Sequence, residues 1–453
     1  MRRFIIILVV LAVIIGTPIF GSGRQEGAAP DAPGATVLRY LHFETRPGIY
    51  DAINNAMQDF MAQNPDIFID AEATSAQMVN HKIAAYLRAG VALDVIQSDL
   101  GTGGRMASTG LLEPLDDVVE ALGGRDAFLP GSLLMYDDVV YGINLGSSTL
   151  ILYYRTDLFA EAGLEPPTNW DELLHAARTL HSPPNIAGIS LPADSSRATP
   201  QFAGQFLWQA GGDFFDRDLN VTLDTPEARK AVEFYAQLLQ YAPEDVASYS
   251  YADTVFTFTG GRSAMTVYWQ AMDFIYDQNP DLLDKVGAVI LPKGEMHASY
   301  IGAKYTVIHA DSQNKEAAKG WIKHLYRADV LANIGSAMIG MYFPVTYAGA
   351  DALRAMDHPR TNAIGQFYFD VMPRAMEHAF NAMLNAGGIN KEQGVIEETG
   401  VFNPYVDVLH NTPYFAEAIQ RVAFEGWTPE RAVREAQTQL ERAVAEARRE
   451  REQ

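Results

Sequence analysis

The chain has no cysteine and few basic residues for its length. Its 453 residues include 34 lysines and arginines against 56 aspartates and glutamates, which gives a formal net charge of -22. Without cysteine there are no disulfides, no thiolate metal sites and no cysteine nucleophile, and the acceptor of a bacterial lipid anchor is missing. The acidic excess repels phosphate backbones and anionic headgroups, so we expect no nucleic acid partner.

Motifs of metal binding and nucleophilic catalysis are also missing. The ten histidines form no HExxH motif and no close cluster, and there is no nucleophile elbow. Residues 216–227 have the oxygen-ligand spacing of a calcium loop, but Val221 occupies the position that needs glycine, so we interpret them as a polar hairpin turn. Residues 101–104 are glycine-rich, yet no Gly-Lys-Ser/Thr follows, and we expect a flexible loop beside the ligand. We expect no metal and no cofactor.

The N-terminal sequence is typical of export. Residues 1–23 have the layout of a secretory signal peptide, with two arginines, an unbroken apolar run over residues 4–15, and small residues at 21–23. An uncut membrane anchor is the alternative, but the apolar run is shorter than the roughly 20 residues that span a bilayer. Residues 24–35 are rich in glycine, alanine and proline and predict a flexible tether.

After the tether, the hydrophobic pattern alternates between strands and helices. Strands are predicted over residues 37–43, 67–71 and 94–97, and helices over residues 50–63 and 76–89. This alternation predicts an α/β sheet with right-handed crossovers, and the length is enough for two domains or linked lobes. Further helices are predicted over residues 169–180, 199–209, 225–240, 314–326, 414–424 and 428–449. Two of them begin with Thr-Pro-Glu, at Thr225 and Thr428, which is a typical helix start.

Several sequence blocks together resemble a known family. Residues 137–144, 152–164 and 166–173 are similar to the signature stretch of the family 1 extracellular solute-binding proteins. The likeness continues in the family's order through further blocks, at residues 94–99, 109–115, 209–215, 260–266, 291–292, 312–318 and 343–345. It is the order of these unlike blocks, more than any one of them, that makes the resemblance specific.

The resemblance implies a particular architecture. It is an α/β fold of two lobes, the periplasmic-binding-protein fold, in which a multi-segment hinge joins the lobes and ligand lies in the cleft. Each lobe is then discontinuous, and we expect lobe 1 to comprise residues 36–146 plus 302–358 and lobe 2 to comprise residues 147–301 plus 359–453. Crossovers are expected near residues 146–148, 302–303 and 358–364. Small residues at the first two suit a hinge, because they absorb backbone rotation easily.

The resemblance also implies a function. The chain is expected to be the extracytoplasmic solute-binding protein of a bacterial ABC importer, a monomer and not an enzyme. It would bind a carbohydrate, either a monosaccharide or an oligosaccharide, and deliver it to the membrane permease subunits. We expect it to be periplasmic or otherwise extracytoplasmic, with no lipid anchor. Two alternatives stay open: a non-sugar ligand such as a polyol phosphate, polyamine or iron complex, and a secreted glycosidase with a carboxylate pair.

Candidate ligand residues in the first lobe follow the predicted strands. Ligands of open α/β sheets bind beyond the carboxyl ends of the strands, where His42 and Glu44 follow the first strand and Asp99 follows the third. Asp99 has a second interpretation, as a capping residue in a turn. Arg46 either contacts the ligand or is a surface charge.

Sugars need aromatic plates and polar side chains, and the second lobe supplies both. By the resemblance, Trp269 follows a strand at a point where relatives place a ligand-stacking aromatic, and Gln201 lies where relatives reach ligand from the second lobe. Loops at three further residues, Tyr300, Gly302 and Tyr342, fall where the family brings the chain to the cleft. Packing is the alternative for the aromatic candidates. Trp170, Trp208, Trp321 and Trp427 are predicted to be structural.

Overall fold

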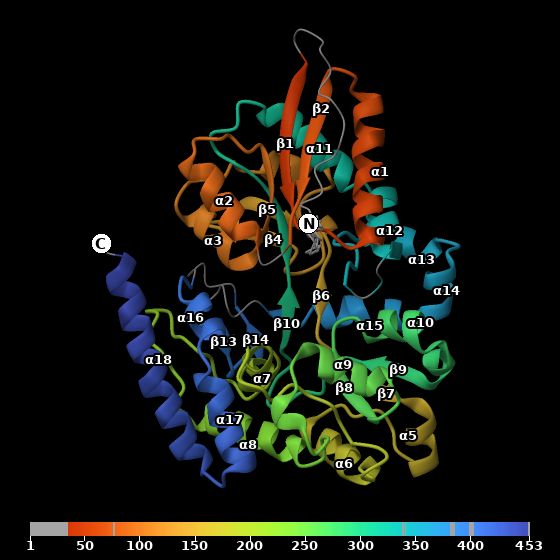
Figure 1. Ribbon diagram of the computed structural model, residues 1–453, viewed down its shortest axis with the longest axis vertical. Helices are drawn as coiled ribbons and strands as arrows, with labels where there is room; N and C mark the ends of the chain where they lie inside the picture. The colour runs from red at the N-terminus through yellow and green to blue at the C-terminus, as the bar shows by residue number, and fades with distance from the viewer. Residues whose placement is uncertain are drawn as a thin grey trace, which may run out of the picture.

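The computed structural model describes residues 35–75, 78–337, 339, 341–380, 386–397 and 403–451. In this part of the chain an upper lobe and a lower lobe are stacked along the long axis of the molecule (Figure 1). The predicted signal peptide, and all but the last residue of the predicted tether, lie outside the described residues. Among the described helices, none is both long enough and apolar enough to cross a membrane.

The upper lobe is built on a six-stranded mixed sheet with the order β2-β1-β3-β11-β5-β4. Strand β1 pairs in parallel with both β2 and β3, whereas β11 runs antiparallel to its neighbours β3 and β5. The start of β11 therefore lies beside the end of β3, at the edge that faces the lower lobe. The strands are β1 (Thr36–His42), β2 (Ile67–Ala73), β3 (Val95–Asp99), β4 (Leu133–Tyr136), β5 (Val139–Asn144) and β11 (Lys304–Ile308).

Helices cover both faces of this sheet (Figure 1), because alternate strand residues point to opposite sides. Leu38 and Tyr40 of β1 pack with Trp321 against α1, α11 and α12, whereas Leu41 and Ile96 pack against α2 and α3. The helices of this lobe are α1 (Pro47–Gln63), α2 (Val79–Arg88), α3 (Leu100–Ser108), α4 (Asp116–Ala121), η1 (Arg125–Ala127), α11 (Lys315–Leu325), α12 (Ala328–Ala337) and α13 (Tyr347–Ala355).

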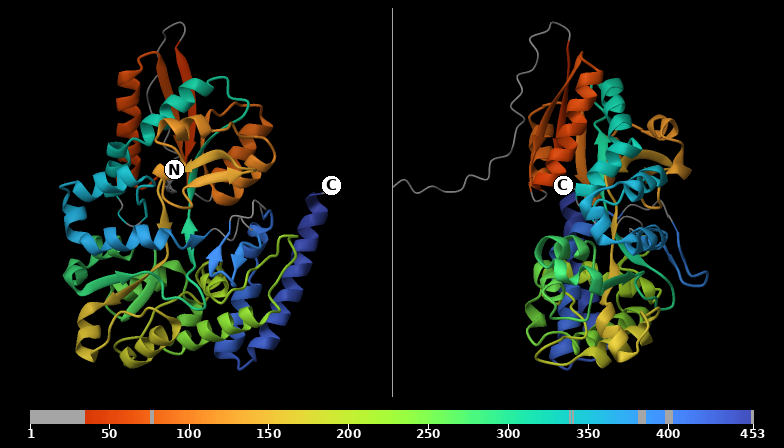
Figure 2. Two further views of the ribbon diagram at one scale, coloured as in Figure 1. Left: turned by 180° about the vertical axis from the view of Figure 1, so that it is seen from behind. Right: turned by 90° about the vertical axis from the view of Figure 1, so that its right-hand side faces the viewer.

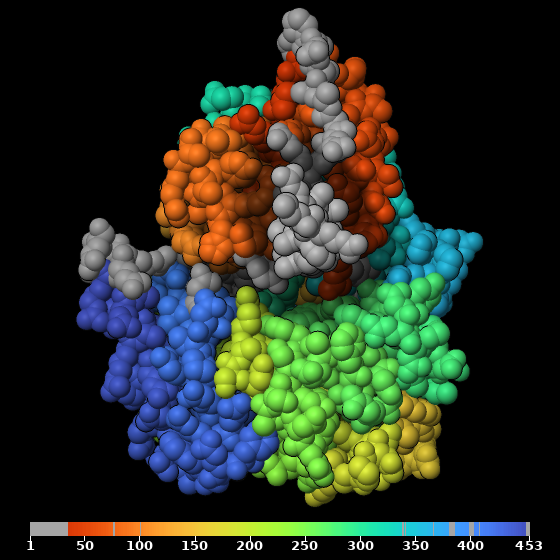
Figure 3. Space-filling view, viewed as in Figure 1, coloured from red at the N-terminus to blue at the C-terminus, as the bar shows by residue number. Residues whose placement is uncertain are grey.

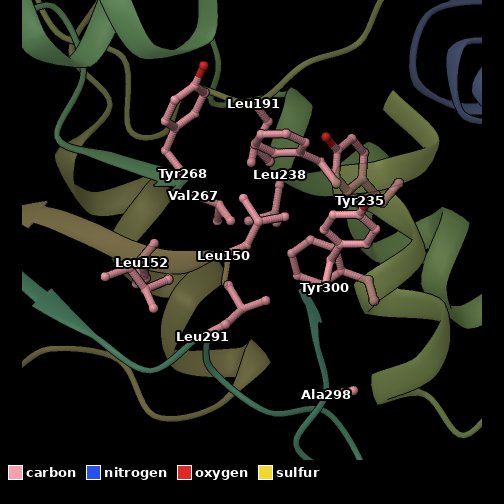
Figure 4. Close-up of a cluster of buried hydrophobic side chains, with 14 of the residues drawn as sticks. Leu150, Leu152, Leu191, Tyr235, Leu238, Val267, Tyr268, Leu291, Ala298 and Tyr300 are labelled. Carbon is pink, nitrogen blue, oxygen red and sulfur yellow. The ribbon is translucent and has the colours of Figure 1, made fainter. Parts of the chain in front are cut away.

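The lower lobe surrounds a smaller antiparallel sheet in the order β8-β7-β9. Figure 4 shows part of its core, in which Leu152 of β7, Val267 of β8 and Leu238 of α8 converge. The elements are β7 (Ile151–Arg155), β8 (Met265–Tyr268), β9 (Val286–Val289), α5 (Thr156–Ala162), α6 (Trp170–Leu180), α7 (Ala198–Gln209), α8 (Pro226–Leu239), η2 (Val246–Ser248), α9 (Tyr251–Thr259), α10 (Ala271–Gln278), η3 (Pro280–Lys285), α14 (Pro359–Ile364), α15 (Gln366–Met376), β13 (Ile389–Asn390), β14 (Val395–Ile396), α16 (Val406–Asn411), α17 (Tyr414–Phe424) and α18 (Pro429–Arg451).

The C-terminal helices belong to the lower lobe. Helices α17 and α18 pack against α8, and α18 runs along the outer edge of the lobe in both Figure 1 and Figure 2. The predicted starts at Thr225 and Thr428 are confirmed, since each hydroxyl accepts a backbone N–H, at 3.2 Å from Ala228 and 3.3 Å from Arg431.

Two short strands run between the lobes. Strands β6 (Ser148–Thr149) and β10 (Ser299–Gly302) pair antiparallel (Figure 1). Strand β12 (Ala379–Phe380) joins β10 in parallel. Helix α14 makes a further link, because it packs against both α12 and α10. In the space-filling view the lobes meet along a transverse boundary (Figure 3), which we call the junction: the residues that follow β1 and β3, those around β6 and β10, and the lower-lobe residues that face them.

Two local predictions have different outcomes. The polar hairpin turn is confirmed, because Phe215 and Val221 form an antiparallel bridge and the Asp216 carboxylate accepts the N–H groups of Asp218 and Asn220. The flexible loop over residues 101–104 is wrong, because these residues lie inside α3. The Asp99 side chain caps this helix and offsets the weak helix propensity of the three glycines.

Candidate functional site

A carboxylate, an ammonium and a phenol meet on the upper side of the junction. Lys304 Nζ lies 3.3 Å from Glu44 Oε2. The Tyr342 hydroxyl donates to the same carboxylate oxygen, and Lys304 donates to the Tyr342 hydroxyl. The ammonium also lies 4.0 Å from the centre of the Tyr342 ring and 5.6 Å from that of Phe43. Burial lowers the pKa of Lys304, and the charge of Glu44 opposes this.

The ends of β1 and β3 fix the position of Glu44. The Phe43 N–H donates to Gln97 Oε1 at 2.9 Å, and Gln97 Nε2 donates to Glu44 Oε1 at 2.7 Å. Because β1 and β3 are parallel neighbours, their carboxyl ends bring these residues together. Sequence reasoning missed Gln97 and Lys304. For Lys304 a signal existed, since it directly follows the expected crossover at residues 302–303.

His42 and Asp99 each have a local structural role. His42 is buried beside Tyr40 and Tyr50, at ring distances of 5.0 Å and 6.2 Å. Burial lowers the pKa of His42 to about 4, against the opposing charge of Glu44, so the imidazole is neutral. Asp99 caps α3, because it accepts the Thr102 N–H at 2.8 Å, and it also accepts Asn80 Nδ2 at 2.7 Å. This agrees with the capping interpretation, and a ligand contact of Asp99 stays a prediction.

Aromatic rings gather on the lower side of the junction. The ring of Trp269 lies 5.0 Å from that of Phe202, 5.9 Å from that of Tyr251 and 6.3 Å from that of Tyr300. Gln201 ties two of them together, since it accepts the Tyr251 hydroxyl and donates to the Tyr300 hydroxyl at 3.4 Å. Three predicted residues, Gln201, Trp269 and Tyr300, therefore lie together. Tyr251 was missed, and no motif in the sequence marks it.

A side-chain contact and long-range charge effects link the lobes. Gln270 Nε2 in the lower lobe lies 3.9 Å from Met341 Sδ in the upper lobe. Burial raises the pKa of the Tyr268 phenol, and the charge of Arg46 opposes this shift. Burial also raises the pKa of Tyr300. The charge of Arg197 lowers this pKa, and the charge of Asp99 raises it further.

An ion pair in the lower lobe completes the junction. Arg360 of α14 donates to Asp273 and to Asp277 of α10, both at 2.7 Å. Burial raises the pKa of Asp273 to about 7, and Arg360 opposes this shift. Within the described ranges, no three histidine, aspartate or glutamate side chains are arranged to hold a metal ion. The site offers hydrogen bonds and ring faces, which suit reversible binding of a polar organic molecule.

Two further predictions concern packing. Trp170, Trp208 and Trp321 are buried, as expected for structural residues. The guanidinium groups of Arg421 and Arg431 lie 4.7 Å and 3.5 Å from the centre of the Trp427 ring. Gly302 pairs with Ser148, and a Cβ atom at this glycine would lie 2.8 Å from Ser148 Oγ. Gly302 thus allows β6 and β10 to approach.

Comparisons with known proteins agree with this arrangement. A family model described as bacterial extracellular solute-binding protein matches residues 45–332. The chain is 24% identical over 370 residues to the putative ABC transporter periplasmic-binding protein YcjN of Escherichia coli K12, covering 79% of this chain and 83% of YcjN. It is 26% identical over 225 residues to an arabinooligosaccharide-binding protein of Halalkalibacterium halodurans, covering 47% and 49%. The structure of the sugar-binding protein MalE from Xanthomonas citri aligns with a TM-score of 0.72 at 20% identity, covering 92% of this chain and 100% of MalE.

Proposed function

The chain belongs to the bacterial extracellular solute-binding proteins, and from this premise we propose that it is the carbohydrate-binding receptor of an ABC importer. The observation that carries the proposal is the aromatic group at the junction, formed by Phe202, Tyr251, Trp269 and Tyr300. Sugars present apolar ring faces edged by hydroxyls, so aromatic plates beside carboxylates and amides suit them. The similarity to an arabinooligosaccharide-binding protein supports the same ligand class.

The ligand lies at the junction in this proposal and contacts both lobes. The candidate contacts are the nine predicted residues, namely His42, Glu44, Arg46, Asp99, Gln201, Trp269, Tyr300, Gly302 and Tyr342. Support comes from the upper cluster around Glu44 and the lower cluster around Trp269. Their neighbours in sequence, Met341 and Gln270, lie 3.9 Å apart between Sδ and Nε2. Lobe closure would then bury the ligand between ring faces and hydrogen-bonding groups.

The lobes themselves are proposed to be residues 36–146 plus 302–358 and residues 147–301 plus 359–453. The sheets support this division, because β11 returns to the upper sheet after β7, β8 and β9 have built the lower one. We further propose that the protein acts as a monomer without enzymatic activity, that residues 1–23 direct its export, and that no lipid anchor holds it. Its protein partners are the membrane permease subunits of the importer.

The experiment is a thermal-shift screen of the purified protein against neutral sugars and polyols, followed by calorimetry on each hit. A ligand that binds only the folded state adds about 2.7 kcal/mol of stability at a concentration 100 times its Kd. X-ray scattering with and without the hit should show a more compact molecule. A chain that binds no carbohydrate, or that steadily releases cleavage products from oligosaccharides, would contradict the proposal.

A further inference from the structure

Lys304 is a largely buried cation of the junction, and two groups of the protein already accept hydrogen bonds from its ammonium. Glu44 lies 3.3 Å from the ammonium, the Tyr342 hydroxyl accepts from it, and the rings of Phe43 and Tyr342 lie beside it. The Lys304 side chain is 20% exposed and that of Glu44 is 5% exposed. An anionic ligand would therefore have to displace a buried carboxylate before it reached this cation, and an uncompensated buried charge is costly.

Ion pairs inside the protein already engage two of the cations in this region. Lys304 Nζ lies 3.3 Å from Glu44, and the Arg360 guanidinium lies 2.7 Å from both Asp273 and Asp277. Each of these cations therefore has a carboxylate partner before any ligand binds.

The spare hydrogen-bonding capacity at the junction is uncharged. In the part of the chain that the structure describes, two buried polar atoms there have no partner, Trp269 Nε1 and Gln270 Oε1, and His42 Nε2 at the end of β1 has none either. Gln270 is 4% exposed and lies against Met341 of the other lobe. Buried polar atoms are almost always satisfied, by protein, by water or by a ligand. Neutral donors and acceptors of this kind match hydroxyl groups.

We propose that the junction selects an uncharged polyhydroxylated ligand, a neutral sugar or polyol, and that Glu44 determines this specificity by forming an ion pair with Lys304. The inference rests on the proposed carbohydrate-binding function and narrows it. Sugar phosphates, sugar acids and amino sugars are then rejected, because each adds a charge, whereas Lys304 and Glu44 already neutralise each other. Discrimination of this kind comes from repulsion and desolvation as much as from attraction.

The wild-type test uses matched ligands. For a neutral sugar found to bind, such as glucose, calorimetry compares it with glucose 6-phosphate, glucuronate and glucosamine at one ionic strength. We expect each charged counterpart to bind at least about 100-fold more weakly. If no carbohydrate, neutral or charged, binds at all, the proposed function fails. If a sugar binds but a charged counterpart binds as tightly, the proposed function stands and this inference is overturned.

Two variants test the role of Glu44. Glu44→Gln keeps the side-chain volume and leaves Lys304 without its carboxylate. The Kd for glucose 6-phosphate divided by the Kd for glucose should therefore fall by at least about tenfold. Lys304→Met leaves Glu44 unpaired, and the same ratio should rise. Glu113→Gln is the control, because Glu113 forms the same kind of pair with Lys315 at 2.7 Å in the upper lobe and is not at the junction.

The ratio separates specificity from stability, since a variant that merely loosens the fold weakens all four ligands together. An unchanged ratio in Glu44→Gln, or a shift of both variants in the same direction, would refute the role of Glu44. If Glu44→Gln does not fold, the wild-type panel and Lys304→Met still decide the question.

Discussion

Gly146 and Tyr342 are in direct contact beside the strands that connect the lobes. A Cβ atom on Gly146 would lie 2.7 Å from Tyr342 Cα and 2.9 Å from its Cβ. The next residues continue the contact, since Ser147 and Phe343 exchange two backbone hydrogen bonds, at 3.0 Å and 3.1 Å. Because Tyr342 also binds Glu44, this close approach holds the chain entering β6 against the upper cluster of the junction.

Gly146→Ala should destabilise the protein. The added methyl group meets backbone and Cβ atoms that cannot rotate away, and overpacking of this kind costs about 1–3 kcal/mol. Urea unfolding measures the change in the free energy of unfolding. Gly320→Ala is the matched control, because Gly320 lies inside α11 with no atom closer than 3.7 Å to its added Cβ, and alanine there should be neutral or stabilising by up to about 1 kcal/mol. Equal effects of the two variants would contradict the argument.

Trp269→Ala should weaken carbohydrate binding about 10- to 100-fold, because the variant removes a stacking plate and an unpartnered indole N–H from the junction. Trp269→Phe should recover part of the affinity, since it keeps a ring face. Calorimetry with the sugar identified in the screen provides the measurement. Trp427→Ala, at the start of the C-terminal helix region, should leave the Kd unchanged. Wild-type affinity in Trp269→Ala would remove this residue from the site.

Asp99→Ala should cost about 1 kcal/mol of stability through the lost cap of α3. Asp99→Asn should retain the stability, because an asparagine side chain still accepts the Thr102 N–H. Chemical denaturation compares the two variants. If carbohydrate affinity falls in Asp99→Asn while stability does not, Asp99 also contacts the ligand. If Asp99→Asn is as unstable as Asp99→Ala, the capping contact is not what holds α3.

Arg360→Met should destabilise the protein in a pH-dependent way. Removing one partner of a buried ion pair costs about 3–5 kcal/mol when the remaining charge has no partner. Burial raises the pKa of Asp273 to about 7, against the opposing effect of Arg360. Without the arginine, Asp273 remains protonated to higher pH. The folded state then holds a proton that the unfolded chain, with its ordinary carboxyl pKa, has released, so the stability of the variant falls as pH rises toward the folded pKa above 7. The loss relative to the wild type develops only as pH rises through 7, where wild-type Asp273 ionises and pairs with Arg360.

The loss in Arg360→Met should therefore be small at pH 5 and large at pH 8, as measured by urea unfolding at both values. The double variant Asp273→Asn with Arg360→Met should remove most of the pH dependence, since no buried carboxyl remains to titrate. A penalty of equal size at both pH values would show that Arg360 acts through packing, for example over the Tyr276 ring at 4.5 Å, and not through the ion pair.

Local patterns in the sequence predict local structure well. Thr225 and Thr428 begin helices as expected, and residues 414–424 form α17 with the predicted bounds. The Asp216 turn also forms as expected, because asparagine and aspartate satisfy nearby backbone N–H groups whatever surrounds them. The glycine run at residues 101–104 is the exception. Its helix depends on a cap from Asp99 and on packing against the sheet, which override propensity.

The sequence by itself determined the family and the two-lobed α/β fold, because these depend on ordered blocks and on hydrophobic periodicity along the chain. Only the tertiary structure revealed which polar groups meet at the junction. Lys304 lies opposite Asp99 in the antiparallel register of β11 and β3, and its ammonium reaches Glu44. Gln201 joins Tyr251 to Tyr300 through hydrogen bonds. These neighbours are set by strand register and by the packing of segments far apart in the sequence, and such long-range contacts leave no periodic signal in the chain.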